Sequence, residues 1–421
     1  MAKRIQRLFN YVPPPRADKL LGALFINREI ELRDGVDFLT SDEDFDPRIY
    51  AIHGDSRTGK SHLARVLLNQ LADRFTIAEV NANSAGSARQ ALERLFMALF
   101  AYIDDLETSE AGPDGLQADD VLLPWRRWFR GIVPLIEGHQ DTVKFKSTHS
   151  FTEMTTLQLG TRGTHVASKA GETRSDEREI TVSHPSDATL VSYLRHLCDV
   201  VWYARGQRPV LIYIDDLDLL TRRNDDEGDQ QAEQFMALLT PVAENIRVVV
   251  VASVRSLYYG KRDKALKGYL DVRLLSNEKL RAVYQRQISE LNDGEPIFTE
   301  LCLRRLIDLA SGRVGVFLSF CYRLWRWRGR EVPITDQHFD QFIEYELTEL
   351  MRAPETADAI GKVVKWIRAG ATSGELPEVD CEDGPLAFLL VRPSGYGANG
   401  RVHLIPETAR VLEQLSDGIV P

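Results

Sequence analysis

Apolar residues along the chain gather into short unbroken runs that alternate with longer stretches of helical periodicity. Two runs, 210–214 and 248–252, are solidly apolar. Runs of this length suit parallel strands that helices cover on both faces. Further strands are expected at 49–52 and 75–80, with a helix at 88–100. Strands that alternate with helices predict an α/β fold built on a parallel sheet.

The pattern changes in three later parts of the chain. Residues 104–185 are polar and alternate between 143 and 182 like antiparallel strands, which predicts an insertion rather than core. Residues 354–419 combine a helix, two apolar runs around a glycine-bearing turn and a final helix, which favours a small winged-helix domain. Between these parts the periodicity is purely helical, with helices expected at 277–291, 299–310, 314–328 and 335–351.

The loop after the strand at 49–52 has the spacing of a phosphate-binding motif. It fits GxxxxGK[ST] throughout, as Gly54, Asp55, Ser56, Arg57, Thr58, Gly59, Lys60 and Ser61. Glycines let the backbone approach phosphate oxygens closely, and the N-terminus of the following helix adds positive potential there. We expect Lys60 to reach the β- and γ-phosphates of ATP and the Ser61 hydroxyl to hold Mg²⁺. The next residue, His62, is included in the predicted nucleotide site.

Polar residues that follow the two apolar runs are the candidates for metal binding and catalysis. At the tip of the first run, Asp215 is expected to hold Mg²⁺ through water, and Asp216 to polarise the attacking water. Asp218 is an alternative for the same work, and an acidic turn that merely caps a core strand is the simpler interpretation. After the second run, Ser253 and Arg255 both qualify to reach the γ-phosphate, although Arg255 could instead be a solvated strand-end charge.

Composition limits the remaining classes of function. With 421 residues the chain is too long for one compact core. No apolar run reaches the ~18 residues that span a bilayer, and no secretory pattern opens the sequence, so we expect a cytoplasmic protein without membrane contact. The net charge of -10 disfavours blanket binding to nucleic acid. Cysteines at 198, 302, 321 and 381 lack metal-ligand spacing, which favours buried thiols.

The order of these motifs resembles that of the AAA+ and STAND ATPases, especially the origin-recognition-type and transposon-regulator branch. The resemblance spans about residues 25–350. It is carried by a box at 25–32 with the pattern F-x-x-R-E-x-E-L, the phosphate loop, the acidic run at 215–218, the Ser253/Arg255 strand, and the lid sequence at 311–315. Two residues depart from the pattern: Asp216 stands where many AAA+ enzymes have Glu, and Gly315 where STAND relatives often have proline.

The resemblance implies a P-loop NTPase domain with a helical lid and roles for matching residues. Phe25 and Arg28 would line the adenine, and Arg313 would approach the phosphates from the lid, with a surface arginine at a helix start as the alternative. Arg262 is the candidate for an arginine that reaches a neighbouring subunit's site, or else a solvated loop charge. The domains expected are a lead-in with the box at 1–46, the ATPase domain at 47–276 with its insertion at 104–185, the lid at 277–351 and the winged helix at 354–421.

Three hypotheses remain for what an ATPase of this kind controls. The first is ATP-dependent self-association. The second is a DNA-binding regulator or loader, because residues 323–330 interleave arginines with Trp325 and Trp327; the alternative is a lid helix with one tryptophan packed inward. The third is a signalling switch that binds an unidentified protein through 104–185 or through the C-terminal domain, which carries a formal charge of -4 over 354–421 and is not expected to grip DNA.

Overall fold

The structure is a computed structural model, and it places most of the chain in two compact units. One unit joins Ala72–Ala252 with Asp44–Ile49, and the other joins Met1–Glu43, Tyr50–Leu71 and Ser253–Pro421. The residues that the structure describes are 9, 15–16, 18–41, 49–55, 57–104, 118–139, 142–147, 178–220, 226–255, 268–329, 331–352, 354–375, 390–391, 401–405 and 412.

A five-stranded sheet has the order β2-β5-β6-β1-β7. Its strands are β1 (Ile49–Gly54), β2 (Thr76–Asn81), β5 (Val210–Asp215), β6 (Val248–Arg255) and β7 (Gly268–Asp271). The pairings of β2 with β5, β5 with β6 and β1 with β7 are parallel. All six residues of β5 are buried, as expected for a strand covered on both faces. The predicted parallel α/β sheet is confirmed, whereas the short strand β7 had no sequence signal.

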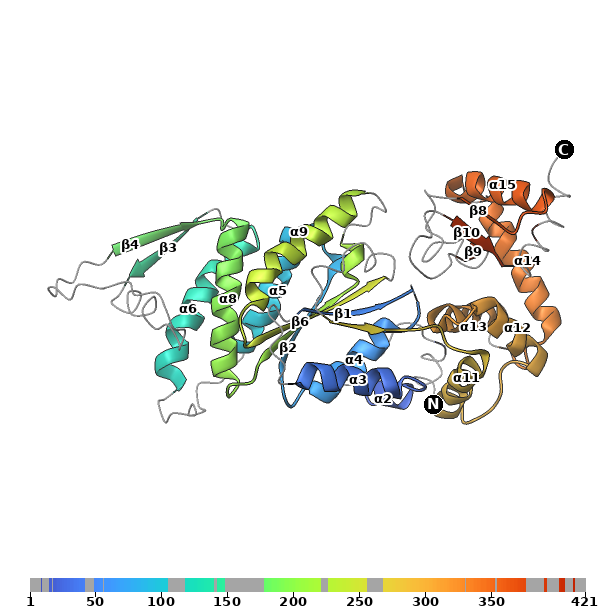
Figure 1. The fold of residues 1–421 in the computed structure, drawn as a ribbon, viewed down its shortest axis with the longest axis horizontal. Coiled ribbons are helices and arrows are strands. Elements are labelled where there is room, and N and C mark those ends of the chain that lie inside the picture. Colours follow the sequence, from blue (N-terminus) through green and yellow to red (C-terminus); the bar gives the residue numbers. More distant parts are fainter. Residues whose placement is uncertain are drawn as a thin grey trace. The chain divides into compact units, whose positions relative to one another are not determined.

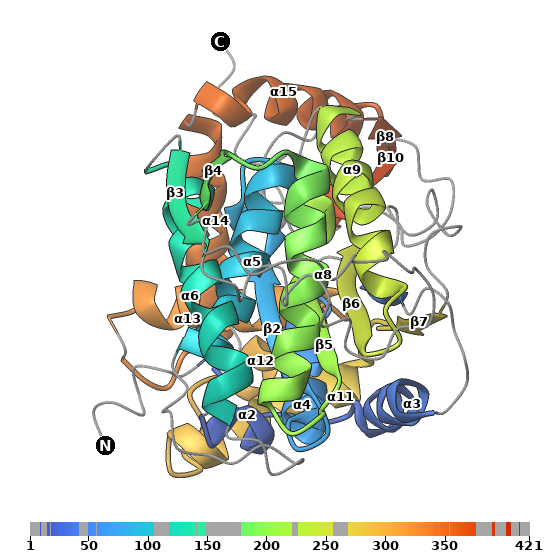
Figure 2. The same ribbon diagram turned by 90° about the vertical axis from the view of Figure 1, so that its left-hand side faces the viewer.

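The unit around residues 72–252 packs its helices on one another and on the strands. Figure 2 shows α5 (Ala88–Asp104), α8 (Asp187–Ala204) and α9 (Asp226–Ala243) side by side, and all three pairs are in contact. Helix α6 (Ala118–Ile136) packs on α5 and α8 through side chains such as Phe129, which is fully buried. The prediction that this stretch is not core is therefore wrong for α6, because its apolar face fills the unit's interior.

An antiparallel hairpin follows α6. Its strands are β3 (Thr142–Ser147) and β4 (Arg178–Ser183), which pair in register from Thr142 opposite Ser183 to Ser147 opposite Arg178. This pairing agrees with the alternation seen in the sequence between 143 and 182. Residues 148–177, which complete the predicted insertion, lie outside the described part of the chain.

The other unit begins with two short elements that pack on the helix after the phosphate loop. Helices α2 (Leu20–Ala23) and α3 (Glu29–Thr40) both contact α4 (Lys60–Leu71). Four further helices form the lid: α11 (Asn277–Leu291), α12 (Glu300–Ala310), α13 (Val314–Trp327) and α14 (Asp336–Arg352). Each lies within one residue of its predicted bounds, and α11, α12 and α13 gather around one apolar core (Figure 1).

The C-terminal elements are α15 (Pro354–Arg368) and a small antiparallel sheet of order β8-β10-β9. Its strands are β8 (Ser373–Glu375), β9 (Leu390–Val391) and β10 (Arg401–Leu404). Of the final helix expected from 406, only Leu412 is described, so the winged helix stays a prediction.

Two predictions from composition can be compared with these elements. Cys198, Cys302 and Cys321 are free thiols and buried, as predicted, while position 381 lies outside the described residues. Among the helices that the structure describes, none is long and apolar enough to cross a membrane.

Candidate functional site

The phosphate loop connects β1 to α4 and is held in a conformation that depends on its glycines. A Cβ on Gly54 would lie 2.6 Å from the carbonyl oxygen of Val272, so only glycine fits there. Gly59 has a φ of +99°, which L-residues with side chains rarely adopt. Arg57 is also left-handed, with φ 61°. The loop backbone therefore leaves the strand and enters α4 through a tight, residue-specific turn.

The side chain of Lys60 closes this loop. Its ammonium donates to the carbonyl oxygens of Gly54 at 3.0 Å and Asp55 at 2.8 Å, and only 7% of the residue is exposed. The Thr58 hydroxyl also donates to the Asp55 carbonyl, at 2.9 Å. A buried cation is thus held inside the loop, at the start of a 12-residue helix whose N-terminus adds positive potential. This arrangement fits an anion such as a polyphosphate.

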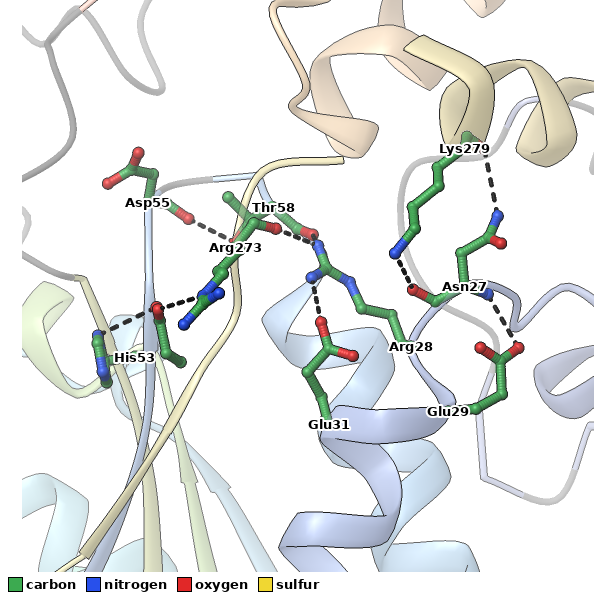
Figure 3. Close-up of polar contacts among 10 residues, drawn as sticks. Asn27, Arg28, Glu29, Glu31, His53, Asp55, Thr58, Arg273 and Lys279 are labelled. Atoms are coloured by element: carbon green, nitrogen blue, oxygen red, sulfur yellow. Dashed lines mark hydrogen bonds and ion pairs between the residues drawn. The ribbon is translucent and has the colours of Figure 1, made fainter. Parts of the chain in front are cut away.

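Arg28, predicted to line the adenine, ties the loop to two other segments. Its guanidinium donates to the carbonyl oxygen of Thr58 at 3.1 Å and to that of Arg273 at 2.5 Å, and it pairs with Glu31 at 2.8 Å (Figure 3). Arg28 is 6% exposed. The sequence motif supplied the arginine and Glu31, but it could not indicate Arg273, because that residue takes part through its backbone.

Phe25 and His62 meet beside this cluster. Their ring centroids are 5.6 Å apart with the planes at 73°, an edge-to-face contact. The His62 Nε2 atom lies 3.0 Å from the carbonyl oxygen of Leu21, and burial lowers the pKa of His62 below its ordinary value. A neutral ring whose Nε2–H donates to this carbonyl is therefore favoured. The structure brings both predicted residues together, and their contact with adenine stays a prediction.

The first turn of lid helix α13 lies directly on the phosphate loop. The backbone N–H of Gly315 donates to the carbonyl oxygen of Arg57 at 2.8 Å. A Cβ on Gly315 would lie 2.9 Å from the Cβ of Arg57, and one on Gly59 would lie 3.1 Å from a Val314 methyl. The departure from proline at 315 thus supplies both an N–H donor and the space for a close approach.

Arg313 precedes that turn as the N-cap residue of α13. It is 4% exposed, so the alternative of a solvated surface arginine is wrong. Its buried guanidinium belongs to the same unit as the phosphate loop. Its predicted approach to the nucleotide phosphates stays a prediction.

The acidic run begins at the last residue of β5, in the other unit. Asp215 is 8% exposed, and one of its carboxylate oxygens accepts a hydrogen bond from the Tyr213 hydroxyl at 2.8 Å. Asp216 follows in the left-handed conformation, with φ 54° and ψ 46°. Asp and Asn are the side-chain-bearing residues that tolerate this conformation best. Tyr213 was missed, and the only signal was a phenol inside an otherwise aliphatic run.

The remaining predicted residues lie on or after β6. The register places Ile214 of β5 opposite Ala252 of β6, and the next residue of β6, Ser253, is fully buried. Arg255 is the last residue of β6, and its side chain lies outside the described part of the structure. The same holds for Arg262 and for Ser56 of the phosphate loop, which are not described at all.

The stretch of arginines and tryptophans at 323–330 is taken up by packing within the lid. Trp325 is 4% exposed, and the Trp327 ring contacts Phe342. Arg323 pairs with Glu346, and Arg328 pairs with Glu331. These contacts favour the interpretation of a packed lid helix over a surface that stacks on bases.

Residues 24–251 match the family described as AAA ATPase domain, which is more than half of the chain. The protein belongs to the AAA ATPase family. The matched segment of this AAA ATPase begins next to Phe25, contains the phosphate loop and the acidic run, and ends within β6. A search of curated proteins gave no match.

Solved structures similar to this AAA ATPase are distant. The Walker-type ATPase of Pyrococcus abyssi is 14% identical with a TM-score of 0.45, covering 96% of this chain and 99% of that one. The ORC1 protein of Aeropyrum pernix, solved in complex with DNA, is 13% identical with a TM-score of 0.43, covering 95% of each chain. The ORC2 protein of the same organism is 12% identical with a TM-score of 0.43, covering 98% of each. At these scores the likenesses carry no argument about function.

Proposed function

We propose that this AAA ATPase binds and hydrolyses Mg-ATP and uses the nucleotide state to control assembly with itself or with a protein partner. The observation that carries this proposal is the contact between Gly315 and Arg57. It joins the backbone of the phosphate loop to the first turn of a lid helix. A change in the loop on nucleotide binding is therefore transmitted to the lid without an intermediate side chain.

The residues of each unit have distinct roles in this proposal. Lys60 provides the positive charge for the β- and γ-phosphates, and the glycine-shaped backbone of the loop provides N–H groups for their oxygens. Ser61 and Asp215 would hold Mg²⁺, which neutralises phosphate charge when bound. Asp216 orients the attacking water and accepts its proton. Ser253, Arg255 and Arg313 are proposed to contact phosphate, and Phe25 to contact the base.

We favour control of assembly over DNA binding as the function of this ATPase. The alternative, a DNA-binding regulator or loader, depends on a basic aromatic surface. In the lid stretch that suggested one, Trp325 is buried, and Arg323 and Arg328 pair with Glu346 and Glu331. Helix α15 carries basic residues at 362, 365 and 368, and the first of these, Lys362, already pairs with Asp358 at 3.0 Å. Assembly through Arg262 of a neighbouring subunit is the specific form of self-association that we propose.

The proposal is tested by measuring ATP binding, phosphate release and molar mass with the full-length chain. Lys60→Ala is expected to weaken ATP binding by roughly a hundredfold, because a buried charge facing phosphate is lost. Lys365→Ala removes an exposed lysine from α15 and serves as the matched control. ATP is expected to raise the molar mass seen by light scattering. A chain that stays monomeric in ATP while it hydrolyses normally would reject self-association, including the role of Arg262, and leave the ATPase proposal intact.

A further inference from the structure

The lid core contains an aromatic side chain from the other end of the sequence. Phe9 is fully buried in this core, although the lid helices begin only at Asn277. Its ring stacks on Tyr284 with centroids 6.0 Å apart, and lies 5.5 Å from Phe298 and 6.3 Å from Trp325. Three rings from three separate parts of the lid therefore surround one phenyl group.

One wall of this pocket, the Tyr284 ring, is held by hydrogen bonds of its own. The Tyr284 hydroxyl accepts from the backbone N–H groups of Ile297 at 2.8 Å and Phe298 at 3.2 Å. The ring that stacks on Phe9 is thus held by the backbone of the α11–α12 connection. These two hydrogen bonds fix the orientation of the Tyr284 ring independently of Phe9.

The lid also pairs with the backbone of the segment that carries Phe9. The Phe9 N–H donates to the side-chain oxygen of Gln287 at 3.3 Å, and Gln287 is 4% exposed. Hydrogen bonds to the main chain combined with a pocket for a side chain are features that protein sites for peptide segments share. An ordinary core contact needs only the apolar half of this arrangement.

The backbone of Phe9 indicates that the pocket, and not local preference, sets its position. Its φ is 56°, in the left-handed region that aromatic residues seldom adopt. Further along the chain, Leu20, Leu24 and Ile26 pack against the same lid core. The N-terminal segment therefore contacts the lid at Phe9 and again from Leu20 to Ile26, which reaches into the box at 25–32.

We propose that the lid carries a peptide-docking site formed by Tyr284, Phe298, Trp325 and Gln287, and that its occupant is the chain's own N-terminal segment, anchored by Phe9. The site binds this segment through one aromatic side chain and one main-chain N–H. Docking of Phe9 attaches the segment that leads into the box at 25–32 to the lid, so that the box and the lid move together. This inference does not depend on ATP hydrolysis.

The test is binding of a labelled synthetic peptide of residues 1–16 to the full-length chain, measured by fluorescence anisotropy without nucleotide. The Phe9→Ala chain, which lacks the anchor, is expected to bind the peptide at least tenfold more tightly than the wild-type chain, whose site is occupied. A Phe9→Ala peptide has the same charge and is expected to bind at least tenfold more weakly to the same protein. Adding Gln287→Ala to the Phe9→Ala chain is expected to weaken binding of the unmodified peptide.

Equal binding to the wild-type and Phe9→Ala chains, or no binding to either, would overturn the proposal. A wild-type chain that dimerises with rising concentration, and a Phe9→Ala chain that does not, would assign the site to the segment of a second copy and overturn occupancy by the same chain. Should Phe9→Ala fail to fold, Phe9→Leu keeps an apolar side chain in the pocket. The Phe9→Leu chain is then expected to bind the peptide more tightly than the wild-type chain does. Equal binding to these two chains, or no binding to either, would again overturn the proposal.

Discussion

The amide of Gly315 donates a hydrogen bond to the carbonyl oxygen of Arg57 over 2.8 Å. Position 315 belongs to the first turn of a lid helix, and Arg57 belongs to the phosphate loop. Neither side chain takes part, so the contact depends on how closely two backbones approach. The space for that approach exists because residue 315 has no Cβ.

Gly315→Ala is expected to destabilise the protein, although alanine is the better helix former. The added Cβ would meet the Cβ of Arg57 at 2.9 Å, and overpacking of this kind costs about 1–3 kcal/mol. Gly361→Ala is the matched control, since a Cβ there meets nothing within 4 Å and should stabilise α15 by about 0.5–1 kcal/mol. Chemical denaturation of both variants gives the comparison. If Gly315→Ala raised the free energy of unfolding as Gly361→Ala does, the close contact between the backbones of residues 315 and 57 would not require glycine.

Asp216→Asn is expected to keep ATP affinity and to lose turnover by roughly a hundredfold, as for removal of a general base. The backbone at 216 has φ 54°, and asparagine tolerates that conformation as aspartate does, so the change removes charge and not shape. Steady-state phosphate release and equilibrium ATP binding measure the two effects. Asp218→Asn is the control. If it is the inactive variant and Asp216→Asn is not, the catalytic role belongs to Asp218.

Tyr213→Phe tests whether the phenol positions Asp215. Loss of its hydrogen bond to the carboxylate is expected to raise the Mg²⁺ concentration for half-maximal activity by roughly tenfold, as for other partners of metal ligands. Tyr203→Phe is a suitable control, because the buried Tyr203 hydroxyl has no hydrogen-bond partner among the described residues. A Mg²⁺ titration of activity that is identical for both variants would mean that Asp215 does not need Tyr213.

Arg28→Ala removes the cation that links the box, the phosphate loop and the segment after β7. Two backbone carbonyls and the Glu31 carboxylate lose their partner, which should lower the free energy of unfolding by about 3 kcal/mol. Arg33→Ala, on the same helix with 70% of its side chain exposed, should change it by less than about 0.5 kcal/mol. Denaturant midpoints measure both. Comparable losses of unfolding free energy in the two variants would mean that the hydrogen bonds of Arg28 to Thr58 and Arg273 do not stabilise the fold.

The buried ring of His62 gives stability a pH dependence of known sign. Because burial lowers its pKa in the folded state, the unfolded chain takes up the proton more readily. Its contribution is present above the unfolded pKa of about 6.5 and is lost as the pH falls through the lower, folded pKa. His62→Gln keeps a donor for the Leu21 carbonyl but does not titrate. The difference in unfolding free energy between this variant and the wild type should therefore change in favour of the variant below pH 6.5, and a constant difference would contradict the assignment.

How far the sequence predicts this structure depends on whether a feature is local. The lid helices are recovered within a residue of their bounds, because each has an apolar face with the period of a helix. Strand β7 has only four residues, GYLD, and pairs along β1, so its existence depends on a partner distant in sequence. Helix α9 was missed because its first turns are acidic and polar and Pro241 lies near its end.

The same distinction holds for the candidate site. The phosphate loop and the acidic run are contiguous motifs, so residue identities alone indicate them. The carbonyl of Arg273 and the amide of Gly315 act as backbone groups, which any residue carries, and nothing in the sequence singles them out. The stretch at 323–330 allowed two interpretations, a surface for bases or a lid helix with one tryptophan packed inward. Its composition suits stacking on bases, yet Trp325 is committed to the lid core.

The division of the chain between the two units sets an order in which they can form during synthesis. The unit around β2, β5 and α5 consists almost entirely of the contiguous stretch Ala72–Ala252, so its contacts are available as soon as that stretch leaves the ribosome. The other unit waits, since β1 pairs with β7 through Tyr50 opposite Gly268, a closure across more than 200 residues. Closing so long a loop is slow because its entropy must be lost before the pairing compensates for it. The phosphate loop therefore gains its partner in the lid, the amide of Gly315, only after that residue has been made, well after the contiguous unit is complete.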